Sequence, residues 1–171
     1  MTPSRDLTTP TTVDRLRSVF PQASAHPSDD VPRVVVPRDA VRAVLEWLHG
    51  PGGFAFLADV TCVDYLHYHG ATDRFGLVYL LTNLETNERI IVRTFVNDPA
   101  PSVPSVVDLW EAANWLEREV WDLFGIRFEG HPDLRRVVLP PAFESHPLRK
   151  DYPLQGLGER HNLPVVRRGE G

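Results

Sequence analysis

The sequence has a single cysteine, Cys62, among its 171 residues. One thiol excludes an intrachain disulfide framework, a Cys-rich zinc site and an iron–sulfur cluster held by four thiolates of this chain. Long apolar runs are also missing, since the stretch 53–63 is broken by Asp59 and a membrane-spanning helix needs about 20 apolar residues. Residues 1–12 are polar, without the apolar core of a secretion signal. We therefore expect a flexible N-terminus and no transmembrane segment.

The sequence also lacks an excess of basic residues and the common catalytic motifs. The formal net charge is -5, and the basic residues near the C-terminus are interleaved with acids, which argues against nucleic acid as a partner. No Gly-rich nucleotide loop, zinc-protease helix or serine-hydrolase elbow occurs. The composition and motifs therefore favour a binding or scaffolding module over an enzyme that acts alone.

Hydrophobic periodicity predicts an α+β domain over residues 13–125. Because short connections join the last three strands, we expect a small, mostly antiparallel sheet with helices packed on one face. The first of these three strands reads as apolar on much of both faces. The expected elements are a helix over 13–20, a brief strand over 34–36, a helix from Asp39, its predicted cap, to Gly50, and strands over 54–63, 75–81 and 89–96.

The longest helix is predicted over residues 105–124, with Gly125 as a left-handed C-terminal cap. Its apolar stripe consists of Leu109, Ala113, Leu116, Val120 and Leu123. Arg118 and Asp122 fall on the opposite side, where their spacing favours an ion pair along the helix surface.

Glu117 breaks this pattern because it falls within the apolar arc of the helix. An ionised carboxylate there needs a partner, or its pKa rises. Our hypothesis is that an arginine satisfies it, either Arg135 or Arg136 from the chain beyond the helix, or an arginine of another protein.

Residues 126–171 contain many prolines and no sustained helix or strand periodicity. A segment of this kind has no core of its own, so it is either disordered or ordered on another protein. Its aromatic residues and arginines favour the second reading, an extended segment that wraps a partner.

Three histidine patterns leave room for chemistry. His67 and His69, two residues apart near a predicted strand end, could hold a metal, as in a small metal-dependent enzyme. His131 or His146 could act as a general base only beside an orienting acid. Loop histidines that bond to the backbone are the commoner case, so these readings stay alternatives to a non-catalytic role.

Several motifs resemble the 30 kDa-type (C-type) subunit of respiratory complex I. The run EREVWDLFGIRFEGHPDLRR at 117–136 is similar to that family's signature, and HPLRKDYP at 146–153 to its C-terminal motif. Segments 59–65, 74–79 and 105–116 resemble its sheet and helix regions, so the likeness covers about residues 13–155. Residues 142–145 depart from the pattern.

The resemblance implies a non-catalytic subunit in the peripheral arm of a proton-translocating NADH:quinone oxidoreductase. It further implies a peripheral position on the cytoplasmic side of a bacterial membrane, with FMN, iron–sulfur clusters and quinone held by other subunits. The implied partners are chiefly the quinone-site (D-type) subunit, and also the B-type and I-type subunits. The equivalent subunit of a membrane-bound hydrogenase or another complex-I-like enzyme is the alternative. The expected interface residues are Glu117, Arg118, Glu119, Asp122, His131, Arg135, Arg136, His146, Arg149, Lys150, Asp151 and Tyr152.

Overall fold

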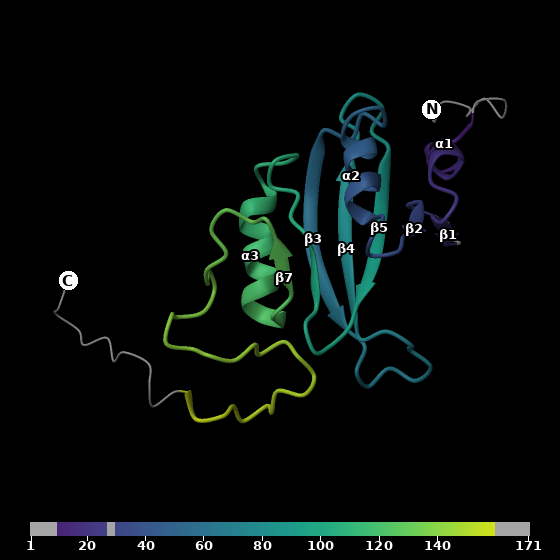
Figure 1. Ribbon diagram of the computed structural model, residues 1–171. Coiled ribbons are helices and arrows are strands. Elements are labelled where there is room, and N and C mark those ends of the chain that lie inside the picture. The colour runs from purple at the N-terminus through teal and green to yellow at the C-terminus, as the bar shows by residue number, and fades with distance from the viewer. Residues whose placement is uncertain (1–9, 27–29, 160–171) are drawn as a thin grey trace.

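The computed structural model describes residues 10–26 and 30–159. Residues 1–9, most of the N-terminal stretch that we expected to be flexible, lie outside the described residues, whereas Thr11 caps the first helix. The elements, in chain order, are α1 (Thr12–Val19), β1 (Ser24–His26), β2 (Arg33–Val35), α2 (Val41–His49), β3 (Phe56–Asp64), β4 (Phe75–Thr82), β5 (Arg89–Val96), β6 (Ser102–Pro104), α3 (Ala113–Phe124) and β7 (Arg127–Glu129) (Figure 1).

The expected α+β fold is confirmed. A five-stranded sheet has the order β1-β2-β5-β4-β3, and its three long strands pair in antiparallel fashion as predicted. Strand β2 runs parallel to β5, which makes the sheet mixed. In Figure 1, α2 lies in front of the sheet and α3 stands beside β3. The shared core between helices and sheet explains why the strand residues that face the helices are buried.

Strand β3 differs from its prediction because only one of its faces is buried. A bulge between Leu57 and Asp59 shifts the alternation, so that Leu57 and Val60 both point into the core. Phe56 and Val63, expected to be buried, are 48% and 38% exposed. The β-branched and aromatic content of this strand therefore reflects its place in the sheet, not burial on both sides.

Helix α2 has the predicted apolar stripe, with Val41, Val44, Leu45 and Leu48 all buried. Its predicted cap is wrong. Ala40 occupies the N-cap position, and no side chain caps the helix. Asp39 lies one residue too early, in the turn that precedes the cap, so its carboxylate does not meet the free N–H groups of the first helical turn.

Helix α3 is shorter than predicted, because it begins at Ala113 and not near Ser105. The Glu117 carboxylate accepts hydrogen bonds from the Ser105 hydroxyl and the Val106 N–H, both at 2.7 Å. These bonds hold residues 105–106 against the side of α3, so this part of the chain cannot extend the helix axis. At the other end, Gly125 has φ 77°, and the predicted left-handed cap is confirmed.

Gly125→Ala is expected to destabilise the protein by about 1–2 kcal/mol from the left-handed backbone alone. A Cβ atom there would also lie 2.7 Å from Cδ2 of His146, so the cost should be larger still. Gly70→Ala is the matched control, because Gly70 has φ 84° but no atom within 4 Å of the new Cβ. Urea denaturation compares the two variants, and equal losses of stability would show that the His146 contact is unimportant.

Candidate interaction site

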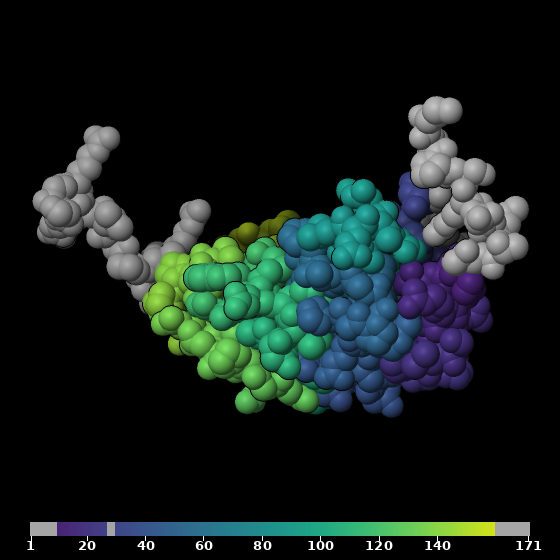
Figure 2. All heavy atoms as spheres, turned by 90° about the horizontal axis from the view of Figure 1, so that it is seen from above, coloured from purple at the N-terminus to yellow at the C-terminus, as the bar shows by residue number. Residues whose placement is uncertain are grey.

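The hydrophobic core continues past Gly125. Ile126 and Phe128 are 0% and 2% exposed, and β7 pairs in parallel with β6. The prediction that residues 126–171 lack regular structure is wrong for β7 but confirmed for residues 130–159, which we call the C-terminal segment, and residues 160–171 lie outside the described residues. This segment passes α3 and loops beneath it in Figure 1, and its atoms gather with those of α3 at the end of the molecule away from α1 in Figure 2. It therefore lies on this chain's own domain.

Asp122 is the first anchor of the C-terminal segment. Its carboxylate is fully buried and accepts hydrogen bonds from Nη1 of Arg136 at 2.5 Å and from the backbone N–H groups of Val137, Val138 and Leu139 at 2.8–3.0 Å. Burial by itself raises the pKa of Asp122, but the bonds from Leu139, Val138 and Arg136 outweigh it and lower the pKa. The ionised carboxylate thus holds four successive residues of the segment against α3.

The predicted ion pair between Arg118 and Asp122 is wrong, because each side chain binds the C-terminal segment. Arg118 donates to the carbonyl oxygens of Arg135 at 3.1 Å and Arg136 at 3.4 Å, and its guanidinium lies over the Trp115 ring. The supposedly solvent-facing side of the helix is therefore covered, and Arg118 is only 6% exposed. Both residues were expected at an interface, and the structure shows that they build one within the chain.

Glu117 is fully buried, and burial raises its pKa to about 7 despite the bonds from Ser105 and Val106. The hypothesis that an arginine of the segment neutralises it is wrong. Arg135 is mostly exposed and pairs with Asp133 at 2.8 Å, and Arg136 pairs with Asp122. Glu117 therefore holds the turn before α3 in place and does not contact the segment.

A second anchor holds residues 149–151 beside the end of β3 and the start of β4. Asp64, whose carboxylate is buried, accepts from the Lys150 N–H at 2.8 Å and from Arg74 at 3.2 Å. Arg74 also pairs with Asp98 and, at 2.8 Å, with Asp151. Burial alone would raise the pKa of Asp64, but the bonds from Arg74 and Lys150 lower it. These ion pairs and hydrogen bonds tie distant parts of the chain together.

Arg149 completes this second anchor. It pairs with Asp98 at 2.9 Å and with Asp151 at 3.3 Å. The Phe75 ring is shared by Arg149 and Arg74, whose guanidinium carbons lie 4.9 and 4.7 Å from its centroid. Asp64, Arg74 and Asp98 were not among the expected site residues. Nothing in the sequence indicated that these three residues bind the segment, because their partners at 149–151 are far away in sequence.

His131 and His146 bond to backbone atoms of this chain, whereas His67 and His69 are exposed. Nε2 of His131 lies 3.2 Å from the Asn114 carbonyl oxygen, and Nδ1 of His146 lies 2.9 Å from the Asp122 carbonyl oxygen. His67 and His69 lie in exposed turns after β3, so the argument that they share one side of a strand is wrong. Within residues 10–26 and 30–159, no three His, Cys, Asp or Glu side chains are grouped to hold a metal ion.

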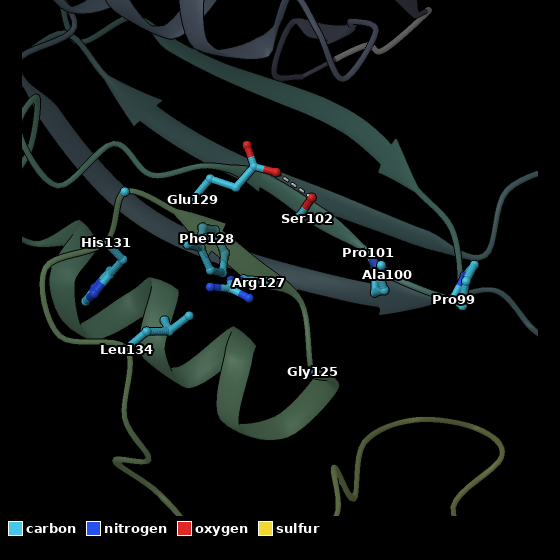
Figure 3. A pocket seen from close by; sticks show the side chains of 11 residues that line it. Pro99, Ala100, Pro101, Ser102, Gly125, Arg127, Phe128, Glu129, His131 and Leu134 are labelled. Carbon is cyan, nitrogen blue, oxygen red and sulfur yellow. Dashed lines mark hydrogen bonds between the residues drawn. The ribbon is translucent and has the colours of Figure 1, made fainter.

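A hollow of about 600 Å³ lies between the loop at 99–102 and the chain after α3 (Figure 3). Glu129, at its edge, accepts a hydrogen bond of 2.7 Å from Ser102. Both ring nitrogens of His131, which also lines it, are engaged, since Nδ1 accepts from the Asp133 N–H at 3.0 Å. The hollow therefore offers no free general base.

The remaining expected residues face outward or stay within the segment. Glu119 and Lys150 are exposed, while the Tyr152 hydroxyl donates to Glu159 at 2.9 Å. The polar anchors leave apolar side chains of the segment turned to solvent. We call these the apolar rim: Val138, Leu148, Leu154 and Leu157, which are 56%, 47%, 106% and 66% exposed. Exposed apolar side chains on a segment that is anchored by polar bonds are available for contact with another protein.

Comparison of the sequence with known proteins identifies relatives of this chain. Residues 34–157 match the family model of the respiratory-chain NADH dehydrogenase, 30 Kd subunit. The C-type NADH-quinone oxidoreductase subunit of Trichlorobacter lovleyi is 49% identical over 73% of this chain and 76% of its own length. The second C/D-type subunit of Aquifex aeolicus is 38% identical over 86% of this chain, which corresponds to 25% of that longer protein.

Solved structures agree with this placement. A trypsin-resistant fragment of Nqo5 matches 72% of this chain and all of its own length, with a TM-score of 0.64 and 39% identity. A chain of an archaeal membrane-bound sulfane sulfur reductase matches 93% of both chains, with a TM-score of 0.73 and 25% identity. Within the described residues, no helix has the length and apolarity to cross a membrane. This chain belongs to the 30 kDa subunit family of the respiratory-chain NADH dehydrogenase.

Proposed function

We propose that this chain is a non-catalytic, structural subunit of the peripheral arm of an NADH:quinone oxidoreductase, and that its apolar rim contacts another subunit. The observation that carries the proposal is that polar groups of the C-terminal segment bind this chain while several of its apolar side chains face solvent. The Arg136 side chain and the Lys150 backbone N–H bind Asp122 and Asp64 of the chain's own domain. In contrast, Leu148, Leu154 and Leu157 are left exposed. The domain thus holds the segment in shape, and the ordering entropy of later docking is reduced.

The quinone-site (D-type) subunit is the proposed main partner, and the B-type and I-type subunits are further ones. The name of the Aquifex relative joins the C and D types, and a fused chain keeps two partners at high effective concentration. FMN, iron–sulfur clusters and quinone are proposed to lie on other subunits. The one cysteine supports this, because burial raises the pKa of Cys62 to about 12 and keeps its thiol protonated. The proposed position is peripheral, on the cytoplasmic side of the bacterial membrane.

Replacing both Leu154 and Leu157 with aspartate is expected to lower co-purification of the quinone-site subunit at least tenfold, since two buried leucines contribute about 1.5–3 kcal/mol each. These side chains are largely exposed in this chain, so the fold should be unaffected. Leu84→Asp is the control, because Leu84 is 63% exposed in the turn between β4 and β5. Undiminished co-purification of the double variant would contradict the role of the apolar rim.

Truncation provides a coarser test. Removing residues 126–171 would take Ile126 and Phe128 from the core, so we move the proposed domain boundary to Glu129. Deletion of 130–171 should leave an α+β domain of lower stability, because Arg118, Asp122 and Asp64 lose partners, and should abolish co-purification of the quinone-site subunit. Circular dichroism and affinity purification measure the two effects. Retained co-purification would place the contact elsewhere on the domain.

A related complex with another electron donor is the second candidate. The likeness to a sulfane sulfur reductase chain over 93% of its length favours it. Purification of the tagged chain with its partners separates the two candidates, because only the first predicts a co-purifying flavoprotein that oxidises NADH. A complex without NADH oxidation would favour the second.

A further inference from the structure

Alternate residues of the three long strands differ in exposure. On β4 and β5, residues that face the helices are buried, whereas their neighbours on the other side are partly exposed. We call this other side the outer sheet face. Its apolar members are Val35, Phe56, Val63, Val78, Leu80, Ile91 and Phe95.

Strand register makes these apolar side chains neighbours. Leu80 pairs with Ile91, and Gly76 pairs with Phe95, whose ring covers the glycine. Directly paired residues have Cβ atoms about 5 Å apart, so these side chains lie close together in a patch on β4 and β5, with Val35 on β2 and Val63 on β3 at either side and Arg93 among them. Partly exposed apolar residues that lie close together, unlike scattered ones, indicate a contact surface.

The patch is hollowed at its end near the turn before β4. Hollows of about 390 and 340 Å³ both include Asp73 and Phe95 in their walls. Tyr65 and Tyr68 line the first and Val35 the second. The two hollows lie on either side of Asp73 and Phe95, and the aromatic walls of the first suit an inserted side chain of a partner.

Unpaired positive charge lies at the edge of the patch, at Arg33, and within it, at Arg93. Arg33 pairs in register with Ile91, and Arg93 with Val78, so both arginines belong to the outer sheet face. In the part of the chain that the structure describes, neither has an ion pair or side-chain hydrogen bond, whereas Arg74, Arg136 and Arg149 are all ion-paired. Of the acids nearby, Asp73 is bound by Asn97 at 2.7 Å. Asp59 pairs in register with Leu80 and also belongs to the outer sheet face, so the positive charge lies on the β2–β5 side of the face and the negative charge at the β3 edge.

We infer that the outer sheet face binds a segment of another protein that presents apolar side chains flanked by carboxylates. The apolar residues would cover Leu80 and Ile91, and the carboxylates would pair with Arg33 and Arg93. A second copy of this chain is disfavoured, because it would bring the same arginines together. The inference rests on the proposed function, since the partner is then another subunit of the same assembly. It adds a surface that is separate from the apolar rim.

Photo-crosslinking in the assembled complex tests this inference. A benzophenone amino acid at position 80 should crosslink to a peptide of another subunit with Asp or Glu within a few residues of the site. The same probe at position 84, in the turn beyond β4, is the control and should not give that peptide. A crosslink to a second copy of this chain, to a peptide without acids, or to nothing would overturn the inference.

Charge reversal supplies the second arm. Arg93→Glu should reduce the amount of this chain retained in the purified complex about tenfold, whereas Arg17→Glu, on exposed α1, should not. An aspartate-to-arginine change at the crosslinked site should restore retention. If the chain is in the complex but position 80 stays unreacted, the outer sheet face is wrong and the proposed function stands. If the unmodified chain is absent from the complex, both fail.

Discussion

Asp122→Ala should detach the C-terminal segment from α3 and destabilise the folded protein by about 3–5 kcal/mol, the usual cost of removing one partner of a buried ion pair. The variant leaves Arg136 without its carboxylate and three backbone N–H groups without acceptors. Water can reach these groups only if the segment lifts from the helix. Trypsin should therefore cut after Arg135 and Arg136 much faster in the variant, and urea denaturation should show the loss of stability.

The matched control is Glu119→Ala, since Glu119 is exposed on the same helix. The pH gives an independent check. The pKa of Asp122 is lowered in the folded protein, so its contribution is fully present above the ordinary value of 3.8 and is lost as the pH falls through the folded value. Asp122→Asn should behave like the acidified protein. Unchanged proteolysis of Asp122→Ala at neutral pH would show that the segment is held by other contacts.

Glu117→Gln should stabilise the protein at pH 8 by up to about 3 kcal/mol, which is the free energy that separates a pKa of 4.5 from one of about 7. Burial favours the protonated carboxyl. Its contribution to stability is therefore fully present below pH 4.5 and is lost as the pH rises through about 7. Glutamine has no charge to bury, and its side chain can still accept from Val106 and donate to the Ser105 hydroxyl.

Denaturation curves from pH 5 to pH 8 measure this effect. The two proteins should be similar near pH 5 and should diverge as the pH rises, with the glutamine variant the more stable. Glu117→Ala is the contrasting variant, because it removes both acceptor atoms and leaves the Val106 N–H buried and unpaired. Equal pH dependence of wild type and Glu117→Gln would mean that the carboxylate stays ionised in the core.

Local patterns predicted the elements whose partners are close in sequence. The stripe of α2 and the strands β4 and β5 were predicted because side-chain alternation along one element reflects which face is buried. The bulge in β3 was missed, since one additional residue in a pairing depends on the neighbouring strand. The start of α3 was missed for the same kind of reason. The bonds from Ser105 and Val106 to Glu117, eleven or twelve residues along the chain, hold residues 105–106 beside the helix, and no pattern around Ser105 predicts them.

The sequence by itself determined the family and the α+β class, because motifs and periodicity are local properties. The proline content predicted a segment without regular structure from residue 126, which holds for residues 130–159 but not for β7. Only the tertiary structure decided which surface the charged side chains serve. Arg118 and Asp122 read as the solvent side of a helix, yet they are buried beneath residues 135–139, and Asp64 binds Lys150 across 86 positions of sequence. Such bonds depend on the path of the whole chain, which no local spacing encodes. These charged groups are buried on the chain's own domain, whereas Leu154 and Leu157 stay exposed and are available to the proposed partner.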